Sequence, residues 1–357
     1  MNHSSYTIIG LMSGTSGDGL DLALCEFNKG SSWSFQILEA ETSPFPTSLE
    51  LDLMRSHTLS ALELSILDVR FGNWMGEQVN RFCKKYSCKP DAICSHGHTV
   101  YHQPEKGLSL QIGNGWAMYQ QTGIKVINDF RMLDVQLGGQ GAPLVPIGDE
   151  WLFPEMDFCI NLGGIANISM NWEGKRIAFD TCPFNLLLNP QAKILGADYD
   201  DLGKWASEGK VDQNLLKGLN SISFYKKNSA KSLGREDLEK DFLPLISASQ
   251  ASEKDILATL IDHFAFQIGT VIKDFSNNAN PKVLLTGGGA YNKFFIQSLE
   301  NHLNGAITIP KTAPQLIEFK EALIFGFLGV LRLRGEINCL SSVTGADRDS
   351  SGGMIFG

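Results

Sequence analysis

An aspartate and a pair of glycines stand close together in residues 161–185, NLGGIANISMNWEGKRIAFDTCPFN. Gly163 and Gly164 follow an apolar strand pattern, and a glycine turn can direct backbone N–H groups toward an oxyanion. Asp180 ends a second short apolar run, where a lone carboxylate is placed like a general base. These residue types predict a phosphate-binding turn beside a base. The alternative interpretation is a structural hairpin whose aspartate caps a turn.

A second glycine-rich turn lies near the N-terminus, where SGTSGDG separates the strand patterns of residues 6–12 and 20–27. Two strands around such a turn predict a hairpin. Its backbone N–H groups and the hydroxyls of Ser13, Thr15 and Ser16 suit a phosphate group. It is not a P-loop, because no Gly-Lys-Ser/Thr follows and a strand rather than a helix comes next.

The same turn carries two carboxylates, Asp18 and Asp21, on either side of Gly19. Mg²⁺ prefers carboxylate oxygen and water as ligands, so one of these side chains could hold it directly or through water. The alternative is the polar tip of a hairpin.

A third glycine turn, Gly287–Gly289, lies between a predicted strand at Val283–Thr286 and a predicted helix from about Asn292. Glycines before a helix N-terminus are typical of nucleotide or phosphate sites. A dinucleotide-binding fingerprint would need glycine where Asn292 stands, which disfavours that kind of site. The next predicted helix, at residues 315–333, carries Glu321, which either faces a cleft or lies on a solvated helix rim.

Three histidines stand close together in SHGHTVYHQP, residues 95–104. His96 and His98 would alternate onto one face of a strand, but no carboxylate or cysteine nearby completes a metal-binding set with His102. Contact with a substrate, or a place in the core, is the favoured role for these side chains.

Arg131 follows the predicted strand at residues 125–130, and its planar guanidinium suits an anionic substrate group. A salt bridge to Asp129 or Asp134 is the competing interpretation. The segment GGQGAPLVP, which contains Gln140, is flexible and then stiff, as expected of a hinge or a substrate loop.

Apolar residues at helical spacing predict one or two amphipathic helices in residues 60–86, with an apolar face made of Leu62, Ile66, Val69, Trp74, Met75, Val79 and Phe82. A second such pattern predicts a helix at residues 252–275, with Ser252 as its N-cap. The 357 residues are long enough for two domains, and a hydrophobic fraction of 43% is that of a globular protein. The net charge of −9 excludes a general nucleic-acid surface.

Seven cysteines without a CxxC pair indicate a reduced, cytoplasmic protein. No signal peptide is visible, and the most apolar stretch, Ala322–Leu331, is too short to cross a membrane.

Three glycine turns in this order indicate two similar lobes that hold a nucleotide in the cleft between them. With these motifs the chain resembles the anhydro-N-acetylmuramic acid kinase family. The resemblance runs from residue 8 to about 346, through GLMSGTSGDGLDLALC, SHGHTVYHQP, DFRMLD, GGQGAPLVP, NLGGIANI, FDTCPFN, LLTGGGAYN and SSVTGA.

The resemblance implies an α/β protein with a two-lobed actin-like ATPase (ribonuclease H-like) fold and its active site in the inter-lobe cleft. The lobes would be residues 1–130 plus 337–357 and residues 131–336. The family uses ATP and Mg²⁺ to open 1,6-anhydro-N-acetylmuramic acid and phosphorylate it to N-acetylmuramic acid 6-phosphate during cell-wall recycling. A cytoplasmic homodimer is expected, with a small amino sugar as its partner and neither nucleic acid nor membrane.

Matching positions assign roles that follow from the resemblance. Asp180 would activate water, and Glu321 would be a second acid near the sugar. The expected ATP-binding residues are Gly14, Thr15, Ser16, Gly17, Asp18, Gly19, Asp21, Gly163, Gly164, Gly287, Gly288 and Gly289, with Asp18 near the metal. The expected substrate-binding residues are His96, Arg131, Gln140 and Asn185.

The chain departs from the family's pattern at several positions of these motifs. The family usually has Leu at Gly17, Gln at His98, Asp-Pro at Asn114-Gly115, Lys-Gly at Asp201-Leu202 and a small residue at Phe184. These differences motivate the alternative hypothesis of a catalytically altered or inactive paralogue that binds nucleotide or sugar.

Overall fold

The computed structural model describes residues 4–13, 19–226 and 231–357, which form two compact units. Unit 1 comprises Met1–Phe153 and Phe319–Gly357, and unit 2 comprises Pro154–Glu318. The sequence placed the changes of lobe at 130/131 and 336/337 instead. The segment after residue 130 belongs with unit 1 because the backbone N–H of Gln140 donates to the carbonyl of Thr344, near the C-terminus.

Unit 1 is built around a sheet with the strand order β12-β7-β4-β1-β2-β3 and a separate hairpin, β5-β6. Its described strands are β1 (Ser5–Ser13), β2 (Leu20–Lys29), β3 (Trp33–Ser43), β4 (Ala92–Ser95), β5 (His98–Gln103), β6 (Leu108–Ile112), β7 (Val126–Asn128) and β12 (Met354–Phe356). Strands β1 and β2 pair in antiparallel register, from Ser5 opposite Asn28 to Ser13 opposite Leu20, so the hairpin predicted from the sequence is confirmed.

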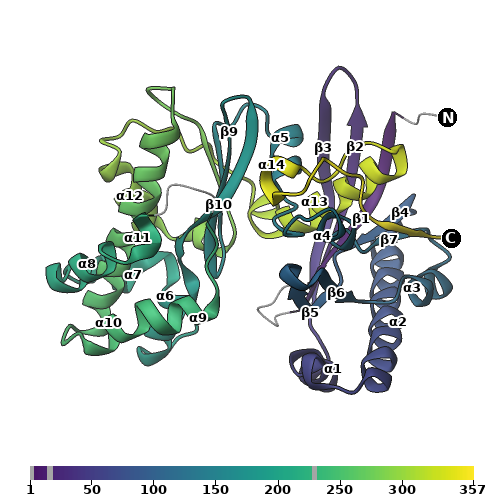
Figure 1. The fold of residues 1–357 in the computed structure, drawn as a ribbon, viewed down its shortest axis with the longest axis horizontal. Helices are drawn as coiled ribbons and strands as arrows, with labels where there is room; N and C mark the ends of the chain where they lie inside the picture. The colour runs from purple at the N-terminus through teal and green to yellow at the C-terminus, as the bar shows by residue number, and fades with distance from the viewer. Residues whose placement is uncertain (1–3, 14–18, 227–230) are drawn as a thin grey trace. The chain divides into compact units, whose positions relative to one another are not determined.

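Helices cover this sheet, and Figure 1 shows the longest of them, α2, beside α3. The described helices of unit 1 are α1 (Thr47–Met54), α2 (Ala61–Tyr86), α3 (Gly115–Thr122), α4 (Met132–Gln136), α5 (Pro146–Leu152) and α14 (Ser341–Thr344), with 3-10 turns at Ser56–Thr58 and Pro104–Lys106. Ser60 and Glu63 form a capping box at the start of α2, which is one continuous helix.

The buried face of α2 differs from the predicted one in its first turns. Leu62, Ile66 and Val69 are 72%, 57% and 45% exposed. The face that packs into the unit 1 core instead carries Leu67 and Phe71, and continues to Phe82. Leu67 is buried between the exposed Ile66 and Val69, so in these turns the core contacts a different side of the helix from the one that the apolar spacing indicated.

Helix α13 (Pro314–Arg334) contains the change of unit, at Phe319, where φ is −111° and ψ is 16°. Its residues Ala322–Leu331 are all buried, as expected for a core helix. The helix lies directly on β1, because a Cβ at Gly10 would overlap the carbonyl oxygen of Ala322. Glycine is therefore required at residue 10 by close backbone approach.

Unit 2 contains a sheet with the strand order β10-β9-β8-β11. Its described strands are β8 (Phe158–Leu162), β9 (Ile165–Trp172), β10 (Lys175–Pro183) and β11 (Val283–Thr286). Its described helices are α6 (Asn185–Ile194), α7 (Lys204–Glu208), α8 (Gln213–Asn220), α9 (Arg235–Asp237), α10 (Leu243–Ala248), α11 (Glu253–Phe275) and α12 (Lys293–His302). Shorter turns lie at Asp201–Gly203, Ser223–Lys226, Leu238–Phe242 and Gly288–Tyr291. The α/β class predicted from the sequence is confirmed in both units.

Helix α11 is the central helix of unit 2, and it contacts α6, α7, α8 and α12 (Figure 1). Ser252 caps it by accepting from the N–H of Asp255, as predicted. Within the described residues it alone is long and apolar enough to cross a membrane, but 72% of the relevant window is buried inside the unit, as in core helices of soluble proteins.

A buried polar network crosses α11 at His263. Its Nδ1 donates to Asn220 Oδ1 at 2.7 Å, and its Nε2 accepts from the hydroxyl of Tyr225 at 2.8 Å. This pattern fixes one neutral tautomer, since each ring nitrogen already has a partner. Burial lowers the pKa of His263 to about 3.

We expect His263 to make the stability of unit 2 depend on pH. Its pKa is lowered on folding, so between about pH 6.5 and pH 3 the unfolded chain binds more protons than the folded one. The free energy of unfolding should therefore fall as the pH is lowered through this window. Denaturant titrations at several pH values should give a shallower pH slope for His263→Gln than for wild type. The exposed His57 provides the control variant, His57→Gln, and an unchanged slope in His263→Gln would contradict the assignment.

Candidate active site

Asp180 lies near the end of β10, the edge strand of the unit 2 sheet. The register of β10 against β9 shifts between Asp180 and Cys182, so Thr181 is the extra residue of a β-bulge. Bulges near active sites commonly redirect a side chain. Burial raises the pKa of Asp180, while hydrogen bonds from Leu233 and Ser232 oppose that rise. A raised pKa makes a carboxylate a stronger base, which suits a group that must accept a proton.

The Gly163-Gly164 turn connects β8 to β9 and is tied to the start of α6. The carbonyl of Gly164 accepts from the N–H groups of Phe184 and Leu186, at 2.8 and 3.1 Å. The carbonyl of Gly163 accepts from the N–H of Asn185 at 3.2 Å. The predicted second turn and Asn185 are therefore parts of one local structure.

The Gly287–Gly289 turn follows β11, as predicted. Gly287 has φ +79°, and a Cβ there would lie 2.6 Å from Asn161 Oδ1 and 2.9 Å from the carbonyl oxygen of Leu162. Only glycine adopts this positive φ without strain and also leaves room for these neighbouring atoms. A Cβ at Gly289 would overlap the ring of Phe184. Gly288 differs, because a Cβ there would have only Asn185 Nδ2 nearby, at 3.9 Å.

Phe184 is fully buried beneath this turn. Its ring centroid lies 5.2 Å from that of Phe264 and 4.9 Å from that of Phe295. The large side chain at this departure from the family's pattern therefore supports the glycine turn from the core and does not project toward a ligand.

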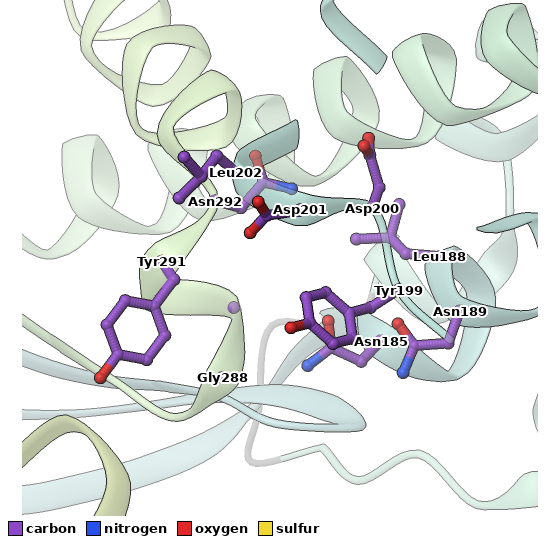
Figure 2. A pocket seen from close by; sticks show the side chains of 11 residues that line it. Asn185, Leu188, Asn189, Tyr199, Asp200, Asp201, Leu202, Gly288, Tyr291 and Asn292 are labelled. Atoms are coloured by element: carbon purple, nitrogen blue, oxygen red, sulfur yellow. The ribbon is translucent and has the colours of Figure 1, made fainter. Parts of the chain in front are cut away.

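A cavity of about 380 Å³ opens beside Gly288 and Gly289 in unit 2. It is lined by Asn185, Leu188, Asn189, Tyr199, Asp200, Asp201, Leu202, Gly288, Gly289, Tyr291 and Asn292. In the view of Figure 2 the rings of Tyr199 and Tyr291 lie on opposite sides of Gly288. Exposed aromatic rings around an open glycine backbone suit a planar ring, such as a nucleobase.

Two polar lining residues of this cavity have structural partners. Asp200 accepts from the N–H groups of Trp205 and Ala206 at 2.8 and 2.9 Å, at the start of α7. Asn292 is the N-cap of α12 and accepts from the N–H of Phe295. Of the residues that line the cavity, only Asn185, Gly288 and Gly289 were expected from the sequence to contact a ligand, and most of the others lie in residues 188–202. Their segment is polar and turn-rich, and it carries no phosphate-binding signal that could have identified it.

Asp201 and Leu202, two further departures from the family's pattern, both line this cavity. Leu202 has φ +56°, in the left-handed region that costs a non-glycine residue about 1–2 kcal/mol. A glycine at this position would avoid that cost.

In unit 1, Arg131 hydrogen-bonds to His96 and to the chain at Gly141. Its Nε and Nη2 lie 3.1 and 2.8 Å from His96 Nε2, and its Nη1 donates to the carbonyl of Gly141 at 2.7 Å. The Nδ1 of His96 lies 2.9 Å from the carbonyl of Gly97 and must donate to it. His96 is therefore neutral, and burial together with the charge of Arg131 lowers its pKa to about 3.

This geometry corrects two expectations. Arg131 forms no salt bridge with Asp129 or Asp134 among the described residues. His96 and His98 do not share one strand, because His96 follows β4, Gly97 adopts φ +74°, and His98 begins β5. The turn at Gly97, which strand alternation does not take into account, separates the two histidines. The described part of the chain contains no group of three metal-binding side chains.

Asp134 holds the segment that contains Gln140. Its Oδ1 accepts from the Thr344 hydroxyl at 2.7 Å, and its Oδ2 accepts from the N–H of Gly141 at 2.7 Å. Gln140 itself is exposed, with its backbone N–H bound to the carbonyl of Thr344 at 2.9 Å. The buried carboxylate thus fixes a segment that the sequence predicted to be a hinge or a substrate loop.

We expect Arg131→Met to destabilise unit 1. The change leaves the Gly141 carbonyl and His96 Nε2 without their charged donor, and hydrogen bonds to charged groups contribute about 1.5–3 kcal/mol. Urea titration should therefore show a loss of that size in the free energy of unfolding. Arg70→Met, at an exposed salt bridge with Asp52, should cost at most about 1 kcal/mol. Equal losses in the two variants would contradict a structural role for the Arg131 contacts.

Glu321 lies in α13 and is partly buried rather than on a solvated rim. Burial and the nearby charge of Asp21 raise its pKa, whereas the charges of Lys320 and Arg131 lower it. Asp21, in β2, accepts from the hydroxyl of Thr42 at 2.6 Å. Gly19 has φ +147° and lies against the carbonyl of Ser43. The expected sites Gly14, Thr15, Ser16, Gly17 and Asp18 lie outside the described residues.

A family model described as anhydro-N-acetylmuramic acid kinase matches residues 6–357 of the chain. The chain belongs to the anhydro-N-acetylmuramic acid kinase family. A relative of that name from Synechococcus elongatus is 34% identical, with 98% of this chain and 99% of the relative covered. Another family member, from Francisella tularensis subsp. novicida, is 34% identical with 95% of each chain covered. The family recognised from its motifs is thereby confirmed.

The chain also has weaker similarity to solved structures of other proteins. The activator of 2-hydroxyisocaproyl-CoA dehydratase from Clostridium difficile, with bound ADPNP, has a TM-score of 0.43 and 16% identity, and 92% of this chain and 97% of that chain are covered. A ROK hexokinase from Thermus thermophilus has a TM-score of 0.38 and 13% identity, with 91% and 99% covered.

Proposed function

We propose that the protein uses ATP to convert 1,6-anhydro-N-acetylmuramic acid to N-acetylmuramic acid 6-phosphate in cell-wall recycling. The observation that carries the proposal is the family match over residues 6–357. The candidate base Asp180 and the three glycine turns all lie within that range. The two units, each with its own sheet, support the actin-like ATPase fold predicted from the sequence.

In the proposed reaction Asp180 acts as the general base. One carboxylate oxygen removes a proton from water, the water oxygen bonds to the anomeric carbon C1, and the bond from C1 to O6 breaks. The released O6 then attacks the γ-phosphorus of ATP, and ADP leaves. The raised pKa of Asp180 matches this task, because proton transfer is most efficient when the pKa of the base approaches the working pH.

The cavity beside Gly288 is the proposed site for the adenine ring and its ribose. Its volume of about 380 Å³ falls within the usual size of a small-ligand pocket, and two tyrosines and Leu202 supply apolar surface. Gly163 and Gly164 supply backbone groups that suit phosphates, and the Gly287–Gly289 turn is the proposed contact for adenosine. Tyr291 is oriented by its hydroxyl, which donates to Glu318 at 2.7 Å.

Mg²⁺ is the metal that this reaction would use, and the carboxylates of unit 1 are the type of ligand that it prefers. Asp21 and Glu321 are close enough for the charge of Asp21 to raise the pKa of Glu321, and a divalent cation would relieve that repulsion. We propose that Asp21 and Glu321 contribute to the acidic surroundings of the ion. Asp18, the metal ligand that the resemblance implies, lies outside the described residues. When bound, the ion would neutralise charge on the transferred phosphate.

His96, Arg131, Gln140 and Asn185 remain proposed sugar contacts. Arg131 and His96 support the segment at Gly141, so their proposed effect on the sugar includes positioning of that segment. The shared placement of Asp180 and Glu321 at one active site stays a prediction. We also propose a cytoplasmic homodimer, as the family resemblance implies.

The alternative, an inactive binding paralogue, loses support at two of the departures that motivated it. Phe184 is buried in the core. Asn114 is the N-cap of α3, and its Nδ2 also donates to Asp68 at 2.8 Å. An aspartate at 114 would place two carboxylates together, so the amide suits this site.

The proposal is tested with purified protein, ATP, Mg²⁺ and the anhydro sugar. ATP consumption should depend on the sugar, and the product should be its 6-phosphate. In H₂¹⁸O, one labelled oxygen should enter the product at C1 because water opens the ring. Nucleotide binding without any turnover would favour the inactive paralogue.

A further inference from the structure

The chain at 231–233 lies along the free edge of β10, beside Asp180. The backbone N–H of Asp180 donates to the carbonyl of Lys231 at 2.9 Å. In return, the N–H of Leu233 and the hydroxyl of Ser232 donate to Asp180 Oδ2, at 2.8 and 3.1 Å. One short segment therefore binds both the backbone and the side chain of the candidate base.

This segment is anchored on both sides of Ser232. The ammonium of Lys231 lies 4.7 Å from the ring centroid of Phe224, 5.8 Å from Tyr225 and 6.0 Å from Phe179. Such cation–π contacts stabilise most when they are partly desolvated. On the other side, Leu233 is 5% exposed and belongs to the unit 2 core. The position of Ser232 is therefore set by two fixed neighbours.

The rings around the Lys231 ammonium, those of Phe179, Phe224 and Tyr225, form an aromatic anchor for the segment. Tyr225 and Phe179 are themselves held by neighbouring groups. Tyr225 donates its hydroxyl to His263 Nε2 at 2.8 Å, and His263 in turn binds Asn220. Phe179 precedes Asp180 on β10, and its ring centroid lies 5.8 Å from that of Phe275 in α11. The anchor is consequently continuous with the core that supports β10.

We propose that Lys231–Leu233 acts as a carboxylate clamp, in which Ser232 and Leu233 fix Asp180 Oδ2 and orient Oδ1 toward the water. Among the described residues, every hydrogen bond to this carboxylate ends on Oδ2. A carboxylate with one oxygen fixed cannot rotate freely, so the other oxygen keeps one direction. Ser232 is thus a positioning residue, and the inference rests on the proposed role of Asp180 as the base.

The clamp also affects the protonation of Asp180. Hydrogen bonds donated to a carboxylate favour its ionised form, against the burial that raises the pKa of Asp180. The nearby titratable groups are Lys231 on the segment and Cys182 on β10. The other neighbouring elements present side chains that do not titrate: β9 places Asn167 opposite Asp180, and Phe275 of α11 packs against Phe179. Loss of the Ser232 hydroxyl should therefore raise the pKa of Asp180 further.

The test compares the pH dependence of kcat/KM for Ser232→Ala, Ser232→Thr and wild type. The acid limb marks loss of the ionised base, so Ser232→Ala should move it upward by about one pH unit. Ser232→Thr keeps a hydroxyl and should restore the wild-type profile. The matched control is Ser221→Ala, whose hydroxyl donates to a backbone carbonyl of the same unit, and its profile should be unchanged. The KM for ATP should stay constant throughout.

A second pair of variants tests the anchor. Lys231→Met removes the cation and should shift the acid limb in the same direction, whereas Lys231→Arg keeps a cation over the rings and should not. If Ser232→Ala does not fold, this pair of Lys231 variants tests the clamp in its place.

The outcomes separate the clamp from the function on which it rests. If Asp180→Asn is inactive but the Ser232→Ala and Lys231→Met profiles match wild type, the clamp is wrong and the proposed base stands. If Asp180→Asn keeps most of its activity, Asp180 is not the base and the proposed function of this site fails first.

Discussion

Asp180→Asn is expected to lose turnover by at least the roughly 10²–10⁴-fold that general-base catalysis typically contributes. The amide cannot accept a proton from water, but its oxygen can still accept from Leu233 and Ser232. The local structure should therefore be kept while the chemistry is lost. Steady-state rates with ATP and the anhydro sugar measure the loss, and calorimetric titration of an ATP analogue should show unchanged affinity.

The stability of this variant provides a check that it is folded. The pKa of Asp180 is raised on folding, so the folded chain holds its proton more strongly and ionisation of Asp180 costs stability as the pH rises through the folded pKa. Asp180→Asn should therefore melt at or above the wild-type temperature near pH 7, and the difference should shrink toward pH 3.

The control for this prediction is Asp157→Asn. The carboxylate of Asp157 also accepts from a backbone N–H, that of Lys282 at 2.7 Å. This variant should retain full turnover. A similar loss in both variants would indicate a general effect of removing a structural carboxylate, and the assignment of Asp180 as the base would then be wrong.

The local elements around the glycine turns could be predicted from the sequence because short-range rules determine them. The strand at Val283–Thr286 has the predicted bounds. The helix after the triple glycine begins at Lys293 with Asn292 as its cap, where the sequence placed its start. Apolar runs, glycine and capping side chains act within a few residues of one another, and a single sequence contains that information.

The partners of single polar side chains could not be predicted in the same way. Arg131 binds His96, which lies 35 residues earlier in the chain, and Asp134 binds Thr344, which lies 210 residues later. Asp180 receives its donors from Ser232 and Leu233, in a segment for which the sequence assigned no roles. Such pairs depend on how the elements meet in the folded unit, which hydrophobic periodicity does not encode.

The departures from the family's pattern show the same difference between local and long-range information. From the sequence, Phe184 is a departure from the family's small residue and one reason for the hypothesis of an inactive paralogue. In the structure its ring packs between Phe264 and Phe295, which lie far along the sequence. This packing also explains why residue 289 is glycine, because the ring of Phe184 fills the space that a side chain there would need.

The three glycines of the 287–289 turn therefore have separable roles, and this leads to the second large expected effect. Gly287 and Gly289 are required by the fold, since a Cβ at either one meets neighbouring atoms. Gly288 is not so constrained and lies at the cavity wall. A side chain at residue 288 should be tolerated by the backbone and should occupy space that the nucleotide needs.

We expect Gly288→Leu to weaken nucleotide binding without unfolding the protein. Forcing a bulky side chain into a filled site typically costs about 1–3 kcal/mol, which corresponds to roughly 5- to 150-fold in Kd. Titration calorimetry with an ATP analogue measures the affinity, and thermal melting without ligand should match wild type.

Gly30→Leu is the matched control, because Gly30 lies in a hairpin of unit 1 and a Cβ there meets only the Ser32 carbonyl, at 3.8 Å. Gly289→Ala should instead lower the melting temperature by its overlap with Phe184. Unchanged affinity in a folded Gly288→Leu protein would place the nucleotide elsewhere, because this cavity could not then be its site.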